Sequence, residues 1–194
     1  MVRCVIMMHY RPPPGAMERS VSGVEQPPPG TMAGGYHFPR MGSPTSILMD
    51  DSLWPLLRVT FPRVITNAQN EELFARTLSY LRRGERFVSL VDIRQLQSLT
   101  FEQREQQWLF LRQQTVLMRQ WSMGIVALIN SPTLALMARV IVHRIKPSVV
   151  PYSIQASWPS AVSWAADRLN NNGLSEHAQR VRLRLGSSPE GNAR

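Results

Sequence analysis

From residue 46 onward, short apolar runs alternate with helical patterns, and this alternation most limits the possible folds. Three continuous apolar runs follow segments of helical spacing: RFVSLVDI (86–93), IVALIN (125–130) and VVPYSIQAS (149–157). Such runs are typical of parallel strands covered on both faces. Two earlier runs, SILMD (46–50) and WPLLRVTF (54–61), predict a hairpin. The order β, β, α, β, α, β, α, β, α predicts an α/β layered domain, with helices packed on a mixed, mostly parallel sheet of about five strands.

Helix-capping residues delimit the helices expected between these strands. Thr66 can cap a helix over 68–83 that ends at Gly84, the position where a helix commonly terminates. Ser131 can cap another helix, and the segment 101–123 has helical spacing over roughly 34 Å. We therefore expect one long helix in the middle of the domain. Two further helical patterns follow the last strand, over 159–172 and 174–185.

Proline and glycine are concentrated before the first strand. Residues 1–44 contain two PPPG repeats and no regular hydrophobic period, so they cannot bury enough apolar area to offset the entropy of ordering. We expect a disordered leader over 1–44, an α/β domain over 46–185 and a disordered tail over 186–194. Translation starting at Met41 or Met49 is a second interpretation of this leader.

Charge and cysteine content narrow the class of protein. The net charge is +9, but only one of the 22 basic residues is lysine, and no more than two basic residues are consecutive. Without an aromatic-plus-basic signature, this distribution argues against nucleic-acid binding. The single cysteine, Cys4, excludes an intrachain disulfide and a multi-cysteine metal site. No apolar stretch is long enough to span a membrane, and we expect a cytoplasmic protein.

Four segments carry a resemblance to a known family. They are LWPLLRVTFP (53–62), RGERFVSLVDIR (83–94), GIVALINSP (124–132) and PYSIQASWPSAVSWAADRL (151–169). A hairpin followed by three strand–helix units of this size resembles the STAS domain of bacterial anti-sigma-factor antagonists and sulphate-transporter tails. The resemblance implies protein–protein regulation, sometimes with nucleotide or lipid binding, and no catalytic turnover.

The chain departs from this family at the phosphorylated motif. In the antagonists, an Asp at a strand end precedes a D-S-[ST]-G motif at the start of the next helix. Asp92 occupies the strand end here, but the chain then reads Ser98, Leu99, Thr100 and Phe101, with no acid-hydroxyl-glycine motif. The phosphorylation switch therefore does not carry over.

The loop after this strand is nevertheless a candidate partner-binding site. Asp92, Arg94 and Ser98 lie at the carboxyl end of a strand, where open α/β sheets place ligands. The alternative is that Asp92 orders its own loop. Thr100 and Gln103 form a capping box, which is a structural reason for both residues. Ser98 has no such role and is the better candidate for phosphorylation.

The expected long helix has more than one apolar stripe. One line contains Phe101, Trp108, Leu111 and Met118, and a neighbouring line contains Leu109, Val116 and Met123. We expect these lines to face the sheet. The third line, Phe110, Leu117 and Trp121, then projects outward and predicts a partner-binding surface, because a surface helix normally has one stripe. The alternative is that the C-terminal helix covers it.

Other functional signals are weak. Arg139, His143 and Lys146 share one helical face and are a possible anion contact, for an acidic partner or peripheral membrane binding; a solvated outer face explains them equally. No nucleophile elbow, phosphate loop, dinucleotide fingerprint or metal-ligand spacing occurs, and we expect no enzyme activity, cofactor or metal.

These observations favour a non-catalytic regulatory or scaffold protein. It would bind a protein partner, or a second copy as a homodimer, through the long helix and the loop before it. The alternative is a domain that binds a small ligand, a lipid or a nucleotide, near Asp92, Arg94 and Ser131.

Overall fold

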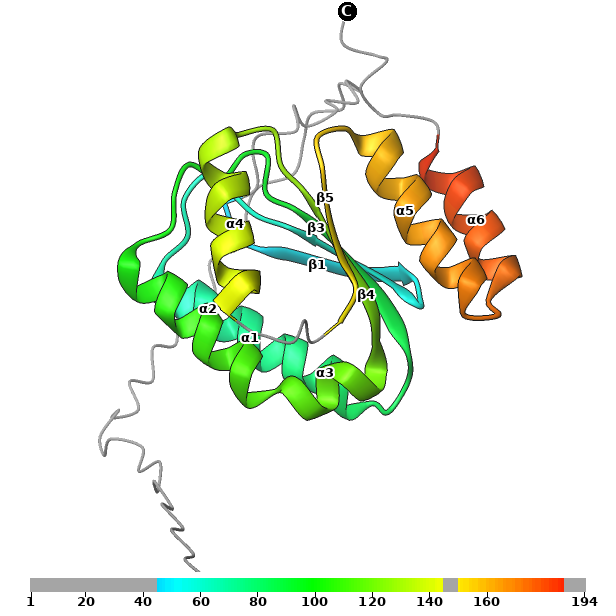
Figure 1. The fold of residues 1–194 in the computed structure, drawn as a ribbon, viewed down its shortest axis with the longest axis horizontal. Coiled ribbons are helices and arrows are strands. Elements are labelled where there is room, and N and C mark those ends of the chain that lie inside the picture. Colours follow the sequence, from blue (N-terminus) through cyan, green and yellow to red (C-terminus); the bar gives the residue numbers. More distant parts are fainter. Residues whose placement is uncertain (1–44, 145–149, 187–194) are drawn as a thin grey trace, which may run out of the picture. The chain divides into compact units, whose positions relative to one another are not determined.

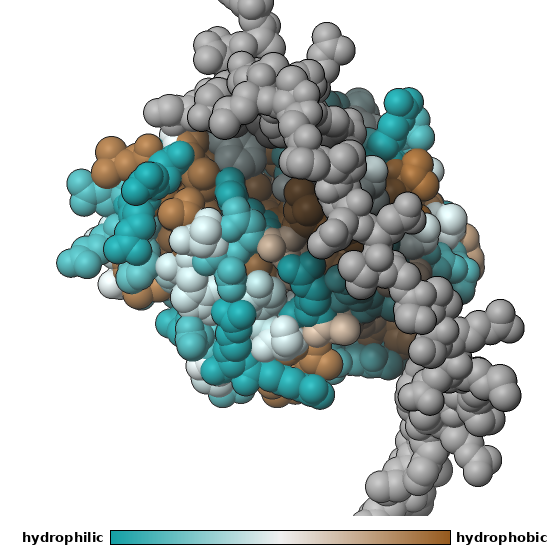
Figure 2. Space-filling model, turned by 180° about the vertical axis from the view of Figure 1, so that it is seen from behind, coloured by the Kyte–Doolittle hydropathy of each residue, from teal (hydrophilic) through white to brown (hydrophobic). Residues whose placement is uncertain are grey.

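The computed structural model describes residues 45–144 and 150–186. The expected leader over 1–44 and most of the expected tail lie outside these residues. Seen from behind, the described surface carries hydrophilic and hydrophobic residues side by side (Figure 2).

In the described part of the chain, five strands form one sheet in the order β1-β2-β3-β4-β5. Their bounds are β1 Leu48–Leu53, β2 Leu56–Thr60, β3 Phe87–Asp92, β4 Ser122–Leu128 and β5 Tyr152–Gln155. β1 pairs with β2 in antiparallel orientation, and the other neighbouring strands are parallel. The predicted α/β class, with a mixed and mostly parallel sheet, is confirmed.

The strand order determines which face each helix covers. Consecutive parallel strands are adjacent, so every crossover advances in the same direction, and right-handed crossovers then place their helices on one face. The helices that connect the parallel strands share a face: α1 Asn67–Arg82, α2 Phe101–Gln113, α3 Thr115–Trp121 and α4 Pro132–Arg144. The opposite face is covered by α5 Trp158–Asn171 and α6 Ser175–Leu185, which follow the last strand (Figure 1).

The face under α5 is closely packed. Ala161, Ala165 and Ala166 of α5 are fully buried, and their small side chains let the helix lie directly on β3 and β4. The strand residues beneath, which include Val88 and Val126, are also fully buried. These helix and strand residues are therefore inaccessible to solvent.

The face under α1 to α4 is packed less closely. The alternate residues of the same two central strands, Ser89, Val91, Ile125 and Ala127, are only partly buried although helices lie over them. Since β3 and β4 are internal strands, the remaining exposure comes from space between the sheet and its helices.

The residues that begin α1 and α2, and the glycine that follows α1, are those expected from the sequence. Thr66 caps α1 in a capping box with Gln69, and Gly84 follows the helix with φ +72°. Thr100 caps α2 in the predicted box with Gln103: its hydroxyl accepts from the Gln103 N–H at 3.1 Å, and the Gln103 side chain accepts from the Thr100 N–H at 3.0 Å.

The prediction of one continuous helix over 101–123 was wrong. α2 ends at Gln113 and α3 begins at Thr115, while residues from Ser122 onward belong to β4. The Thr115 hydroxyl donates to the carbonyls of Leu111 and Arg112, at 3.0 and 2.9 Å, a contact that often bends helices. The segment 101–123 is therefore interrupted twice, first between α2 and α3 and then where α3 passes into β4.

β4 also contains a one-residue irregularity. Phe87 pairs with Ser122, but Val88 pairs with Gly124, so Met123 is an extra residue on β4. Such a bulge reverses the alternation of side chains at that point. As a result Ser122 lies on the same face as Ile125 and Ala127, beneath the helices that connect the strands.

Candidate functional site

The loop after β3 is stabilised by an ion pair and hydrogen bonds between Asp92 and Arg94. The buried Asp92 carboxylate accepts from the Arg94 backbone N–H at 3.1 Å and from the Arg94 guanidinium at 3.1 and 3.0 Å. The guanidinium also lies 5.9 Å from the Trp158 ring centre, a cation–π distance. This geometry agrees with the alternative that Asp92 orders its own loop.

The two hydroxyls considered with this loop differ in environment. Ser98 is exposed, so it is accessible to a partner or a modifying enzyme. Ser131 caps α4, where its hydroxyl accepts from the Leu134 N–H at 3.4 Å. Binding of a partner or a ligand at the strand ends stays a prediction.

The predicted orientation of the apolar stripes was correct in part: Leu111 and Met118 of the first line pack into the core as expected, but the third line does not project outward. Phe110 stacks on Phe74 of α1, with ring centres 4.7 Å apart, and Leu117 and Trp121 pack against the core beneath α1 to α4. They do not project outward, and α1 rather than the C-terminal helix covers them. The bend at Thr115 and the position of α1 set this rotation, and neither is visible in the spacing of apolar residues.

The outward face of α2 and α3 carries other apolar residues. Phe101 is 71% exposed and Val116 is 74% exposed, although both were expected to face the sheet. Leu109 of α2 is also exposed. On the neighbouring helix α4, Leu136 is 62% exposed and Val140 is 50% exposed. Phe101, Leu136 and Val140 line one groove and so form an apolar surface patch across the two helices.

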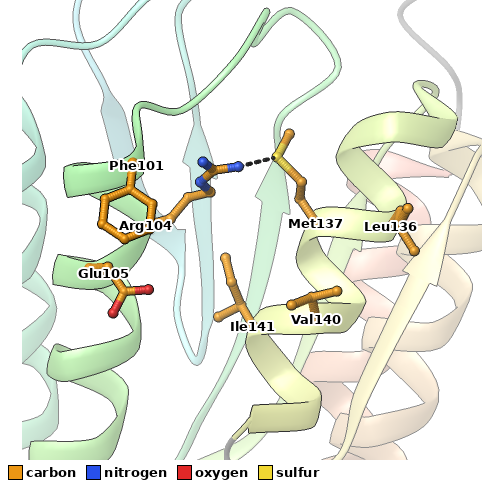
Figure 3. Close-up of a pocket in the computed structure, with 7 residues that line it drawn as sticks. All are labelled: Phe101, Arg104, Glu105, Leu136, Met137, Val140 and Ile141. Atoms are coloured by element: carbon orange, nitrogen blue, oxygen red, sulfur yellow. Dashed lines mark hydrogen bonds between the residues drawn. The ribbon is translucent and has the colours of Figure 1, made fainter.

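A groove of about 340 Å³ lies within this patch, between α2 and α4. Figure 3 shows Phe101, Arg104 and Glu105 on the α2 side and apolar side chains of α4 on the other. Arg104 reaches across the groove and donates to the Met137 sulfur at 3.2 Å. We call this site the α2–α4 groove; it combines a protruding aromatic ring, an apolar wall and both signs of charge.

The possible anion contact on α4 is only partly described. Arg139 and His143 are both exposed, one helical turn apart. Lys146 lies outside the described residues. Anion binding by these three residues stays a prediction.

A second cavity lies between the sheet and α1, α2 and α3. Its volume is about 250 Å³, and its walls are mostly apolar. Partly buried residues of β3 and β4 form the floor, while the stacked pair Phe74 and Phe110 and the buried Met118 contribute from the helices. We call this site the inner cavity.

One polar atom in the inner cavity has no partner. The hydroxyl of Ser122 is buried, and it makes no hydrogen bond within the described residues. An unpaired buried hydroxyl costs on the order of 1–3 kcal/mol. Sequence reasoning missed Ser122 because it assigned the residue to the end of a helix.

The inner cavity is not sealed, because it is about as open to solvent as the α2–α4 groove. A small molecule can therefore enter it without unfolding of the domain. An occupant would remove apolar surface of the cavity walls from water, which is favourable in proportion to the area buried.

Polar side chains fix the start of α2 against α1. Gln103 is buried and donates to the Ile65 carbonyl at 3.0 Å and to the Asn67 side chain at 3.1 Å. The fully buried Asn70 donates to Gln106 at 2.9 Å. These hydrogen bonds join α2 to α1 and to Ile65 just before it, and they give a structural reason for Gln103 and Gln106 on the inner side of α2.

Comparison with known proteins gives no family assignment. No family model, curated protein or solved structure matches this chain. In the part of the chain that the structure describes, no group of three His, Cys, Asp or Glu side chains is placed to hold a metal ion. Within the same residues, none of the helices has both the length and the apolar character needed to cross a membrane.

Proposed function

We propose that this protein is a non-catalytic regulatory or scaffold domain that binds protein through the α2–α4 groove. The observation that carries the proposal is the group of large apolar side chains left exposed on two adjacent helices, Phe101, Leu136 and Val140. Full burial of such a side chain is worth about 1.5–3 kcal/mol. A protein–protein role also agrees with the STAS resemblance of the sequence.

The partner that fits this surface best is a second copy of the chain. A two-fold contact brings the same patch of both copies together, so the patch must be complementary to itself. The protruding ring of Phe101 and the apolar wall beside Leu136 and Val140 satisfy this condition, as do the adjacent opposite charges of Arg104 and Glu105.

The size of the patch predicts a weak dimer. α2 and α4 have 13 residues each and extend about 20 Å at 1.5 Å per residue, and two adjacent helices give a width of roughly 20 Å. The resulting area of about 400 Å² per copy is about half of the roughly 800 Å² of a standard interface. Contacts of this size are typical of weak, transient complexes, so we expect a dimer that forms only at high protein concentration.

Light scattering of the full chain over a range of concentrations tests this proposal. The wild type should change from monomer to dimer, and Leu136→Glu should remain a monomer because it places a charge in the contact. Leu183→Glu is the matched control, since Leu183 is 72% exposed on α6, on the opposite side of the sheet, and should behave as wild type. A wild type that stays monomeric at millimolar concentration, or equal loss of dimer in both variants, contradicts the proposal.

A second candidate function, binding of a small ligand, is favoured by the inner cavity. Sequence reasoning placed a ligand at the strand ends, near Asp92, Arg94 and Ser131. The cavity beneath α1 to α3 supports ligand binding at a different place, and its volume is close to the lower end of ordinary ligand sites.

A further inference from the structure

The inner cavity has walls that restrict the chemistry of an occupant. Of the described residues that line it, none carries a charge, and the floor formed by Val91, Ile125 and Ala127 is apolar. An ion buried in such surroundings loses its hydration without gaining an opposite charge. The occupant should therefore be neutral.

The volume restricts the size of the occupant. An engineered apolar cavity of about 150 Å³ binds benzene, and the inner cavity holds about 250 Å³. A molecule of two fused rings, or an aliphatic group of similar bulk, suits this space. The stacked rings of Phe74 and Phe110 on the helix side offer flat surfaces to an aromatic guest.

The unpartnered hydroxyl of Ser122 supplies the remaining constraint. Ser122 lines the inner cavity, and the bulge at Met123 places it on this face of β4. Its hydroxyl oxygen exposes less than 1 Å² of surface, so a rotation about the Cα–Cβ bond has to turn it toward a guest. A serine hydroxyl can donate one hydrogen bond and accept up to two. A guest with a single hydroxyl, amine or carbonyl group could satisfy it, whereas a pure hydrocarbon could not.

We propose that the inner cavity is a binding site for a neutral, mostly apolar small molecule of about bicyclic size, held by one hydrogen bond to Ser122. This inference rests on the second candidate function and is independent of the α2–α4 groove. Ser122 and Phe74 were not singled out by the sequence, and Phe110 was assigned there to a different surface.

Three probe compounds test it on the full chain: 2-naphthol, naphthalene and 2-naphthoate. Binding is followed by thermal shift and by fluorescence titration. 2-Naphthol should bind more tightly than naphthalene, and the 2-naphthoate anion should bind least. Ser122→Ala should weaken 2-naphthol binding roughly three- to tenfold and leave naphthalene binding unchanged.

Filling the cavity provides the complementary experiment. Ala127→Leu adds bulk to the cavity floor and should abolish binding of both neutral probes. Ser89→Val adds less bulk, from β3, and replaces Ala127→Leu as the cavity-filling variant if circular dichroism shows that Ala127→Leu does not fold. No binding of either neutral probe to the wild type overturns ligand binding altogether. Probe binding that survives in a folded filling variant overturns the site, and an unchanged 2-naphthol affinity in Ser122→Ala overturns the hydrogen bond.

Discussion

Gly124 on β4 is the position where the close packing of α5 can be tested most directly. A Cβ atom there would lie 2.8 Å from Cη2 of Trp164, 3.2 Å from the Pro151 carbonyl oxygen and 3.4 Å from Nε of Arg168. The guanidinium of Arg168 is itself fixed, because it donates to the Met123 carbonyl at 3.1 and 2.9 Å. Gly124→Ala therefore forces the Trp164 ring or the helix that carries it to move.

The expected cost follows from overpacking. Inserting one methyl group into a closely packed region typically costs about 1–3 kcal/mol. Alanine is favoured over glycine inside a strand by about 0.5–1 kcal/mol, which offsets part of the cost of the contact under 3.0 Å. We expect a net loss of about 1 kcal/mol, which lowers the Tm of a domain of this size by roughly 2–4 °C.

Urea and thermal unfolding of a double-mutant cycle measure this effect. Trp164→Phe removes the atom nearest to the added methyl group, so the double variant Gly124→Ala/Trp164→Phe should lose less stability than the sum of the two single changes. Ala127→Val is the control on the same strand, because its added methyl groups enter the inner cavity and should cost little. An unchanged Tm in Gly124→Ala, or strictly additive single changes, would refute the reasoning about close packing.

Two further predictions concern single polar side chains. Hydrogen bonds from Ser52, together with Arg58, lower the pKa of Asp50 from 3.8 to about 2. The ionised Asp50 therefore stabilises the fold above about pH 4, and this stabilisation is lost as the pH falls toward 2. In urea unfolding, the difference in unfolding free energy between wild type and Asp50→Asn should shrink over that range. A difference that does not depend on pH contradicts this assignment. Thr100→Ala removes the cap of α2 and should cost about 1 kcal/mol, whereas Thr100→Ser should retain most of the stability in the same assay.

Features fixed by local interactions could be predicted from the sequence. The capping boxes at Thr66 and Thr100 each involve residues three positions apart, and Gly84 ends α1 through its own backbone conformation. The apolar run of β4 could likewise be recognised, because an internal parallel strand is covered on both faces. The fold class followed from the order of these elements.

Features that depend on distant neighbours could not be predicted. The bulge at Met123 exists only in the pairing of β4 with β3, and it decides that Ser122 faces the inner cavity. The rotation of α2 depends on contact with α1, where Phe74 receives Phe110. A helix with apolar residues on two sides could turn either side toward the sheet. The sequence pattern is the same in both cases, so only the tertiary contacts determine which side is buried.

The connectivity of the sheet explains why both candidate sites lie on the same side. Helices that connect parallel strands have their positions fixed at both ends, and four of them must share one face of the sheet in the described chain. α5 and α6 follow the last strand and pack through small residues such as Ala165. Both faces have a buried core, but the groove and the inner cavity lie among the connecting helices, whose two ends are fixed by the strands they join and which cannot all move closer to the sheet independently.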